Sequence, residues 1–167
     1  WEEKLKSLSE KPKIGFCWRS KNISGQRKNQ YTKLYQWESL LQNPNFSFVN
    51  LQYDLSHEEF LEKYGDFEKT FLDTGHLDQK DDLEGALSLI SNLDFVISAS
   101  ATPSMISSAY GIPTIIYSSP HMYTYGRLSA FSKCSLFGNS VSYLTSDVSK
   151  DENLVTDISN YLSKYFN

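Results

Sequence analysis

The chain of 167 residues is long enough to bury the core of one ordinary domain without support from disulfides or metal. Hydrophobic residues make up 40% of it and aromatic residues 14%, a composition that excludes an intrinsically disordered chain. The formal net charge is -4, and the N-terminal lysines are interleaved with glutamates, so no basic surface is expected and nucleic acid is not an expected partner.

Short apolar runs alternate with helical patterns along the chain, which is typical of βαβ units on a parallel sheet. Residues 1–12 are interpreted as a short helix or linker from a preceding region, and residues 13–167 as the domain itself. Strands are predicted at 13–18, 47–51, 69–72, 95–97, 113–117 and 141–144, and helices at 34–42, 56–64, 77–92, 103–110 and 152–166. We therefore expect an α/β, Rossmann-like parallel sheet of about six strands with helices on both faces.

The cysteines and histidines give no sign of a metal or disulfide site. Cys17 and Cys134 are expected to be free thiols, and the spacing of His57, His76 and His121 does not match a metal-ligand pattern. No apolar run reaches the ~20 residues that span a bilayer, and the N-terminus has no signal-peptide pattern. The sequence thus predicts a cytoplasmic protein with no membrane span, no metal and no cofactor.

The segment LDFVISASATPSMISSAYGIP, residues 93–113, carries the clearest functional signal. Small residues join a buried strand to a helix, so a ligand could approach the backbone there, and the free N–H groups of the helix start favour an anion such as a diphosphate. We predict Thr102 as the N-cap, Pro103 as the first helical residue and Gly111 as the C-terminal stop. A well-capped turn whose small residues serve packing accounts for the same pattern equally well.

The loop after the first strand is a second candidate for phosphate binding. It contains Trp18-Arg19-Ser20, followed by Gly25 and Arg27. Arginine can hold phosphate oxygens through paired donors, and the carboxyl ends of strands are where α/β proteins bind ligands. The alternative is a solvated basic loop.

A third candidate follows the second strand, where Gln52 and Tyr53 could hold a base. Asp81, Asp82 and Glu84 are candidates for contact with ribose hydroxyls. Both signals also have structural explanations, because tyrosines often pack and acidic residues suit the start of a helix.

The motifs KIGFCWRS, FVNLQYD, LDQKDDLEGALSLISNLDFVIS and SASATPSMISSAYGIPT together resemble the C-terminal domains of GT-B glycosyltransferases. Within that class the chain resembles bacterial tetratricopeptide-associated glycosyltransferase-like proteins and, distantly, ADP-heptose:lipopolysaccharide heptosyltransferases. The resemblance runs from Lys13 to Tyr117 and more loosely to the end of the chain.

This resemblance implies one half of a GT-B fold that binds a nucleoside-diphosphate sugar, with the base near Gln52 and Tyr53 and the ribose near Asp82. Transfer to an acceptor hydroxyl would be independent of metal and would need an N-terminal acceptor domain, so the isolated chain is expected to be inactive, and no catalytic residue is assigned. The diphosphate-binding residues are expected to be Arg19, Ser20, Arg27, Ser100, Thr102 and Ser104.

The motif departs from the family at the turn, where an aspartate-threonine pair and a histidine are replaced by Ser100, Ala101 and Met105. Backbone anion binding survives such changes, whereas side-chain contacts do not. Two alternatives therefore stay open. One is a non-catalytic nucleotide-binding or scaffolding module of the same fold, and the other is a sugar-nucleotide epimerase or hydrolase.

Overall fold

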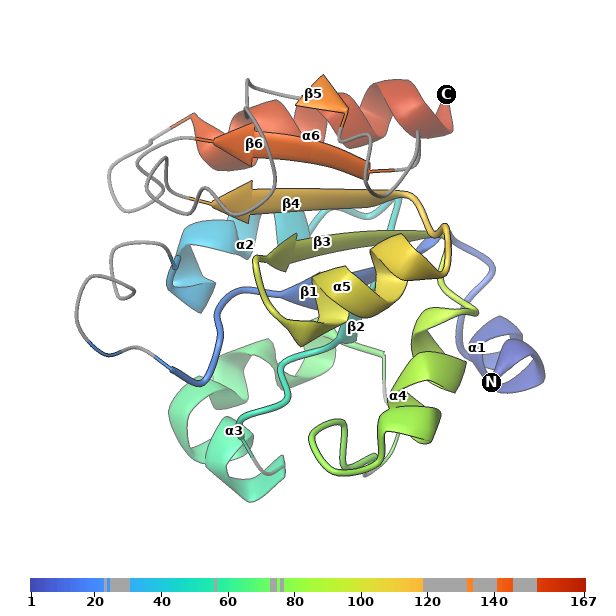
Figure 1. Cartoon of the computed structure of the whole chain (residues 1–167), viewed down its shortest axis with the longest axis vertical. Helices are drawn as coiled ribbons and strands as arrows, with labels where there is room; N and C mark the ends of the chain where they lie inside the picture. The colour runs from blue at the N-terminus through green and yellow to red at the C-terminus, as the bar shows by residue number, and fades with distance from the viewer. Residues whose placement is uncertain are drawn as a thin grey trace.

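A largely parallel sheet lies at the centre of the fold, with helices on both of its faces (Figure 1). The computed structural model describes residues 1–22, 24, 31–55, 57–72, 75, 77–118, 132–133, 141–145 and 153–167. Its strands lie in the order β2-β1-β3-β4-β6-β5. They are β1 (Lys13–Cys17), β2 (Ser47–Asn50), β3 (Phe95–Ala99), β4 (Thr114–Ser118), β5 (Ser132–Lys133) and β6 (Val141–Thr145). The α/β class with a parallel sheet is confirmed.

Four strands, β2, β1, β3 and β4, form the parallel core whose side chains are described. Every residue of β3 and β4 is buried, as expected where helices cover both faces of a parallel sheet. At the edge, β6 pairs parallel to β4, and the two-residue β5 pairs antiparallel to β6. A count of about six parallel strands therefore does not describe this core.

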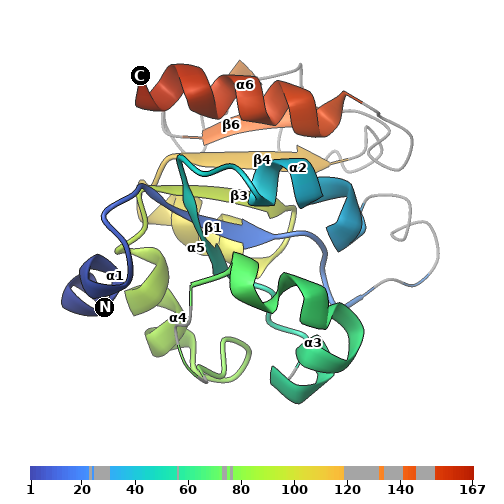
Figure 2. The ribbon, with the colours of Figure 1, turned by 180° about the vertical axis from the view of Figure 1, so that it is seen from behind.

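Successive residues of β1 point to opposite faces of the sheet, because side chains alternate along a strand. Ile14 and Phe16 enter one buried cluster, and Cys17 enters the other. The first cluster is covered by η2 (Leu34–Trp37), α2 (Glu38–Leu41), α3 (His57–Tyr64), η3 (Gly65–Thr70) and α6 (Leu154–Phe166). The second is covered by α1 (Glu2–Leu8), α4 (Leu83–Ile90) and α5 (Thr102–Ala109). Figure 1 shows α5 in front of the sheet, and Figure 2, seen from behind, shows α2, α3 and α6 on the opposite face.

Several predictions of local structure are wrong. The strand predicted at residues 69–72 is instead the end of η3, followed by one isolated bridge between Phe71 and Phe48, because the turn continues from α3 through Gly65. The N-cap of α5 is Ala101 and not Thr102, because the Ser104 hydroxyl reaches back to the Ala101 backbone, and the first helical residue is Thr102 and not Pro103.

A capping residue marks the start of α4, and a glycine marks the end of α5. The helix predicted from residue 77 begins only at Leu83, where Asp82 Oδ1 accepts a hydrogen bond from the Gly85 N–H at 2.8 Å. Gly111 ends α5 as predicted, with a φ of 80° that suits glycine. Within the described part of the chain, no helix combines the length and hydropathy that crossing a bilayer would require.

Gly15 sits where β1 meets tightly packed side chains on the face of α1, α4 and α5. A Cβ at this position would lie 2.5 Å from Leu51 Cδ1 and 2.6 Å from Leu93 Cδ1. Leu51 is completely buried and Leu93 nearly so, so neither side chain has free space to move into. The absence of a side chain at Gly15 is therefore a packing requirement.

We predict that Gly15→Ala lowers the free energy of unfolding by about 1–3 kcal/mol, because an added methyl overpacks this part of the core. Denaturant titration followed by circular dichroism measures the change. Gly65→Ala is the matched control, because no atom lies within 4 Å of its added Cβ. Equal stability of the two variants would contradict the packing argument.

Candidate functional site

The strand order places a topological switch point between β1 and β3. The chain leaves β1 toward β2 on one side and returns to β3 on the other. Ligands of open α/β sheets bind at such a point, beyond the carboxyl ends of the strands. Cys17 is paired with Ser98, and paired strands lie about 4.8 Å apart. The loop that begins at Trp18 and the turn that begins at Ser100 therefore leave the sheet side by side.

The turn between β3 and α5 leaves two hydroxyl groups available. Ser100 is partly buried and Thr102 is exposed, and neither hydroxyl has a hydrogen-bond partner among the described residues. Pro103 has no N–H, and the N–H groups of Ser104 and Met105 donate to the Ala101 carbonyl. The first turn of α5 thus offers the backbone N–H of Thr102 to a ligand and not a full set of donors.

Ser104, by contrast, is used within the protein. Its side chain is fully buried, and its hydroxyl donates to the Ala101 carbonyl at 2.7 Å and accepts from the Ala101 N–H at 3.2 Å. These bonds close the start of the helix, as a capping side chain does. The position predicted to bind a diphosphate is therefore occupied by a helix-capping group.

A buried glutamine fixes the loop after β1. Gln52 is 4% exposed, its Nε2 donates to the Arg19 carbonyl at 2.9 Å and to Asp54 Oδ1 at 2.6 Å, and its Oε1 accepts from the Arg19 N–H at 3.2 Å. Arg19 Nη1 pairs with Asp54 Oδ2 at 2.5 Å, with both side chains largely buried. The guanidinium of Arg19 is thus held in place by an ion pair, and this ion pair uses only one of its three nitrogens.

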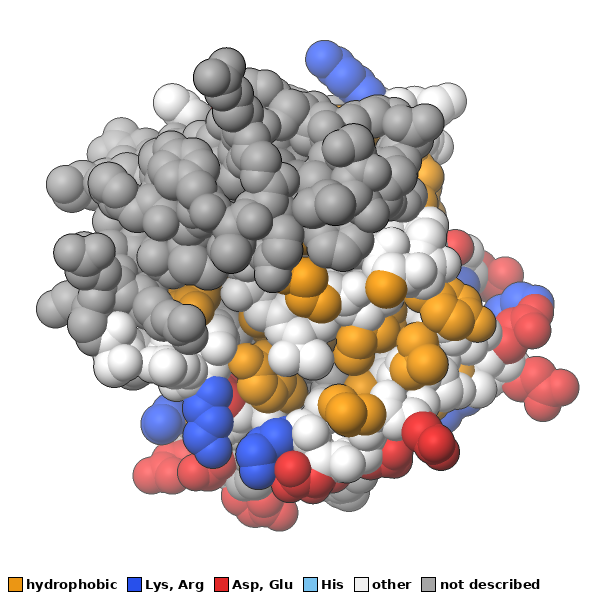
Figure 3. Space-filling view, in the orientation of Figure 1, with side chains coloured by type: hydrophobic (Ala, Val, Ile, Leu, Met, Phe, Trp, Pro, Cys, Tyr) orange, Lys and Arg blue, Asp and Glu red, His pale blue; other side chains and the backbone are white. Residues whose placement is uncertain are grey.

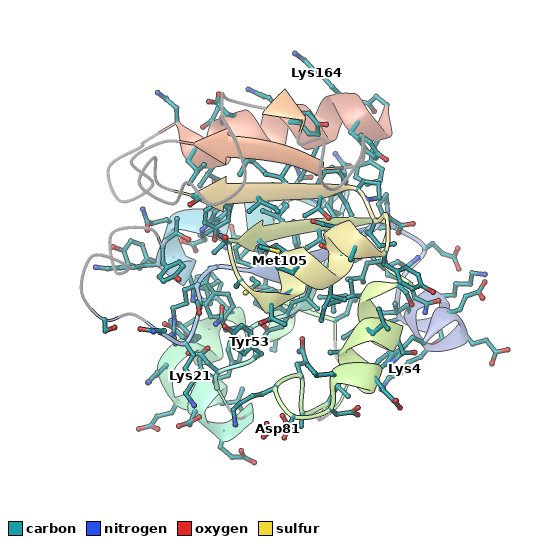
Figure 4. The ribbon with its side chains drawn as sticks, in the orientation of Figure 1. Lys4, Lys21, Tyr53, Asp81, Met105 and Lys164 are labelled. Carbon is teal, nitrogen blue, oxygen red and sulfur yellow. The ribbon has the colours of Figure 1, made fainter. Side chains whose placement is uncertain are left out.

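Tyr53 contributes a further link to the same loop. Its hydroxyl lies 2.9 Å from Ser20 Oγ and accepts a hydrogen bond from the backbone N–H of Lys21 at 3.4 Å. Figure 4 shows Tyr53 and Lys21 together at this edge of the sheet. The ring packs against the buried cluster beneath α4 and α5. Ser20 and Tyr53, both predicted ligand-binding residues, therefore bond to each other.

On the opposite face, a group of hydroxyls holds the end of β1. Thr32 Oγ1 donates to the Trp18 carbonyl at 3.2 Å and accepts from Trp37 Nε1 at 2.8 Å. The Tyr117 hydroxyl donates to the Cys17 carbonyl at 3.3 Å and lies 3.1 Å from Thr32 Oγ1. Burial raises the pKa of Tyr117 well above its ordinary value, so the phenol stays a hydrogen-bond donor.

The indole of Trp18 lies inside an aromatic cluster at this end of β1. Its ring centroid is 6.0 Å from that of Phe16, 6.4 Å from that of Phe60 and 5.7 Å from that of Tyr64. The side chain is fully buried, and its Nε1–H has no hydrogen-bond partner among the residues that the structure describes. A buried donor without a partner costs about 1–3 kcal/mol of the free energy of unfolding.

The structure brings some predicted residues together and leaves others apart. Arg19, Ser20, Gln52 and Tyr53 share one hydrogen-bonded group, whereas the Asp82 carboxylate caps α4. Arg27 lies outside the described residues, as does Gly25. The carbonyl of Asn50 accepts a hydrogen bond from Gln79 Nε2 at 2.8 Å, which ties the loop before α4 to the end of β2. Among the described residues, no group of three or more His, Cys, Asp or Glu side chains is arranged to hold a metal.

Sequence reasoning missed three residues that fix this edge, namely Asp54, Thr32 and Tyr117. Asp54 directly follows the Gln52-Tyr53 pair, and an acid so close to a strand end could have been matched with Arg19. The other two have no comparable signal, because their contact joins positions 85 residues apart.

The comparisons with known proteins give one distant relative. No family model matches the chain, and no solved structure matches it. The chain is 28% identical over 124 residues to Protein FlbA of Caulobacter vibrioides, an alignment that covers 74% of this chain and 21% of that protein. The chain therefore spans about a fifth, 21%, of the length of the curated relative it matches.

This result corrects the family assignment made from the motifs. The match is to Protein FlbA and not to a GT-B glycosyltransferase, a tetratricopeptide-associated glycosyltransferase-like protein or a heptosyltransferase, and no family model or solved structure supports those classes. That identification is wrong. A strand followed by small residues and a helix is a general device of α/β proteins, so it does not define one family.

The Cys17 thiol is not a nucleophile. It is fully buried, and desolvation raises its pKa to about 12. In a Cys134→Ser variant we therefore predict that the remaining thiol does not react with Ellman's reagent at about pH 8 in the native protein and reacts fully after unfolding in denaturant. Rapid reaction in the native protein would contradict the burial of Cys17.

Ser104 offers a second test, because its role in the structure is to cap α5. Ser104→Ala should lower the free energy of unfolding by about 1–2 kcal/mol, since it removes the hydroxyl that satisfies the Ala101 N–H. Thermal melting measures the effect. The control is Ser7→Ala, which removes an exposed serine hydroxyl bonded to a backbone carbonyl one turn away. A change no larger than that of the control would mean that the cap contributes nothing.

Proposed function

We propose that this chain is a Rossmann-like nucleotide-binding module whose ligand places its diphosphate at the switch point between β1 and β3. The observation that carries the proposal is the position of Arg19. Its guanidinium is fixed by Asp54 and its backbone by Gln52, and it follows the strand adjacent to the turn at Ser100 and Thr102. A nucleoside diphosphate, alone or carrying a sugar, fits the chemistry of that arrangement.

The groups around the switch point suit phosphate oxygens. The nitrogens of Arg19 outside the ion pair can donate to a phosphate in a fixed geometry, and such charge-assisted bonds are the stronger class. The Thr102 N–H and the hydroxyls of Ser100 and Thr102 add neutral donors, and the dipole of α5 favours negative charge at its start. The ring of Tyr53, which is partly buried at the exit of β2, is the aromatic surface that we assign to a base.

We propose binding and not catalysis at this edge. Asp54, the one carboxylate in the hydrogen-bonded group, is already paired with Arg19. The Cys17 thiol is buried and neutral, and the Ser104 hydroxyl is committed to the helix cap. The described side chains therefore hold the site in shape, which suits a module that recognises a ligand.

Arg19→Gln tests the proposal directly. We predict that the purified chain binds ADP, UDP or GDP at up to millimolar concentration in isothermal titration calorimetry. Arg19→Gln should weaken the binding about tenfold or more, because it removes a charge-assisted donor while glutamine can still bond to Asp54. Inorganic phosphate serves as the comparison ligand.

Lys164→Gln is the matched control, because it removes one positive charge from α6, at the far edge of the molecule in Figure 4. It should bind nucleotide as the unaltered chain does. The proposal fails if none of the three nucleotides binds, or if Arg19→Gln and Lys164→Gln bind equally well.

A further inference from the structure

Helix α5 is amphipathic in the inverted sense. Three of its four buried side chains are polar, since Ser104, Ser107 and Ser108 are 0%, 0% and 3% exposed and the fourth is Pro103. Its outward side carries apolar residues, with Tyr110, at the C-cap, 59% exposed and Ala109 also exposed. Surface helices normally show charged and polar residues to solvent. This distribution of side chains is expected of a helix whose outer side packs against another molecule.

The charge pattern of the sequence supports the same conclusion. Between Asp94 and Arg127 the chain has no aspartate, glutamate, lysine or arginine, so α5 carries no charged side chain at all. Its serines do not provide a polar outer face, because Ser107 and Ser108 both donate to the Ser104 carbonyl and the Ser107 hydroxyl also accepts from Thr114. An exposed helix without charges is depleted in the residues that keep a surface solvated.

Helix α4 extends this surface, because it packs beside α5 on the same face of the sheet. Leu83 and Leu87, one turn apart on α4, are 56% and 39% exposed. Figure 3 shows hydrophobic side chains gathered over this part of the molecule. We define the α4–α5 face as Leu83, Leu87, Met105, Ala109 and Tyr110, where Met105 is partly exposed and is labelled in Figure 4.

Acidic residues lie at one end of the α4–α5 face. Asp78, Asp81, Asp82 and Glu84 are exposed in the loop and first turn of α4, and Lys80 is the one cation among residues 78–84. Lys80 is itself paired with Asp81, at 3.1 Å. This end of the face is therefore negative, and a second copy of the chain or an anionic lipid surface would bring further negative charge to it.

We propose that the α4–α5 face is a docking site for an amphipathic helix whose apolar stripe is bordered by lysine or arginine. Two adjacent helices form a groove into which the side chains of a third helix can pack. Leu83, Leu87 and Tyr110 provide the apolar contacts, and the acidic end sets the orientation through the basic residues of the partner. The site is separate from the proposed nucleotide site and does not depend on it.

Designed peptides test the chemistry of the partner. The probe is a helical peptide about 18 residues long, built from leucine and lysine with leucines at i, i+3, i+4 and i+7. A scrambled peptide of the same composition removes the apolar stripe, and a leucine–glutamate peptide reverses the charge. Titration calorimetry on the full chain should show binding of the leucine–lysine helix and at least about tenfold weaker binding of the other two.

Two variants then place the binding on this face. Tyr110→Gln should weaken the leucine–lysine peptide about tenfold, whereas Tyr35→Gln should not, although Tyr35 is equally exposed at 61%. Asp81→Lys combined with Glu84→Lys should reverse the preference toward the leucine–glutamate peptide. Asp82 is left unchanged because it caps α4, and thermal melting checks that each variant is folded.

Several outcomes would overturn the proposal. These are the absence of binding by the leucine–lysine helix, equal effects of Tyr110→Gln and Tyr35→Gln, and no change of preference on charge reversal. A dimer in sedimentation equilibrium that Tyr110→Gln dissociates would assign the face to a second copy. Binding to phosphatidylcholine vesicles that Tyr110→Gln abolishes would assign it to a membrane.

Discussion

The hydrogen bonds at the carboxyl end of β1 fix the point from which the rest of the site is built. Gln52 and Asp54 hold the Arg19 backbone and guanidinium from the side of β2, while Thr32 and Tyr117 hold the preceding carbonyls from the opposite face. These partners are buried, so their bonds act in a medium where electrostatic interactions are stronger than in water, and leaving them unmade would be costly. These bonds fix the direction in which the chain leaves β1. Arg19 therefore has a defined place beside the turn before α5.

The sequence was sufficient to predict most of the strands, because short apolar runs between turn residues are a local property. The strand predicted near Lys69 is wrong because Phe71 makes only a single bridge, to Phe48, and an apolar side chain alone does not distinguish a strand from a helical turn. The sequence predicted that the site lies at the carboxyl edge of the sheet, but it did not predict which side chains bond to each other there. The partner of Arg19 lies 35 residues further along the chain, and the Ser104 hydroxyl points inward and bonds to the Ala101 backbone.

The hydrogen-bonded side chains at the carboxyl end of β1 suit the binding of a ligand better than catalysis. Polar side chains at this edge are bonded to other parts of the protein, as in the Arg19–Asp54 and Ser20–Tyr53 pairs. A ligand there would add its bonds to a framework that already exists, which lowers the entropic cost of association. The match to a portion of Protein FlbA is consistent with a module that recurs in a larger protein.

The serines on the inner side of α5 have a consequence for how the helix responds to temperature. Apolar side chains attach most elements of this fold, and the hydrophobic effect weakens on cooling. Ser107 and Ser108 instead bond to the Ser104 carbonyl of the helix itself, and Ser107 also accepts a hydrogen bond from Thr114 at the start of β4, so part of the attachment of α5 rests on hydrogen bonds. Cooling therefore removes less of the attachment of α5 than of its neighbours. The helix beside the proposed nucleotide site should keep its place in the cold while the larger apolar clusters loosen.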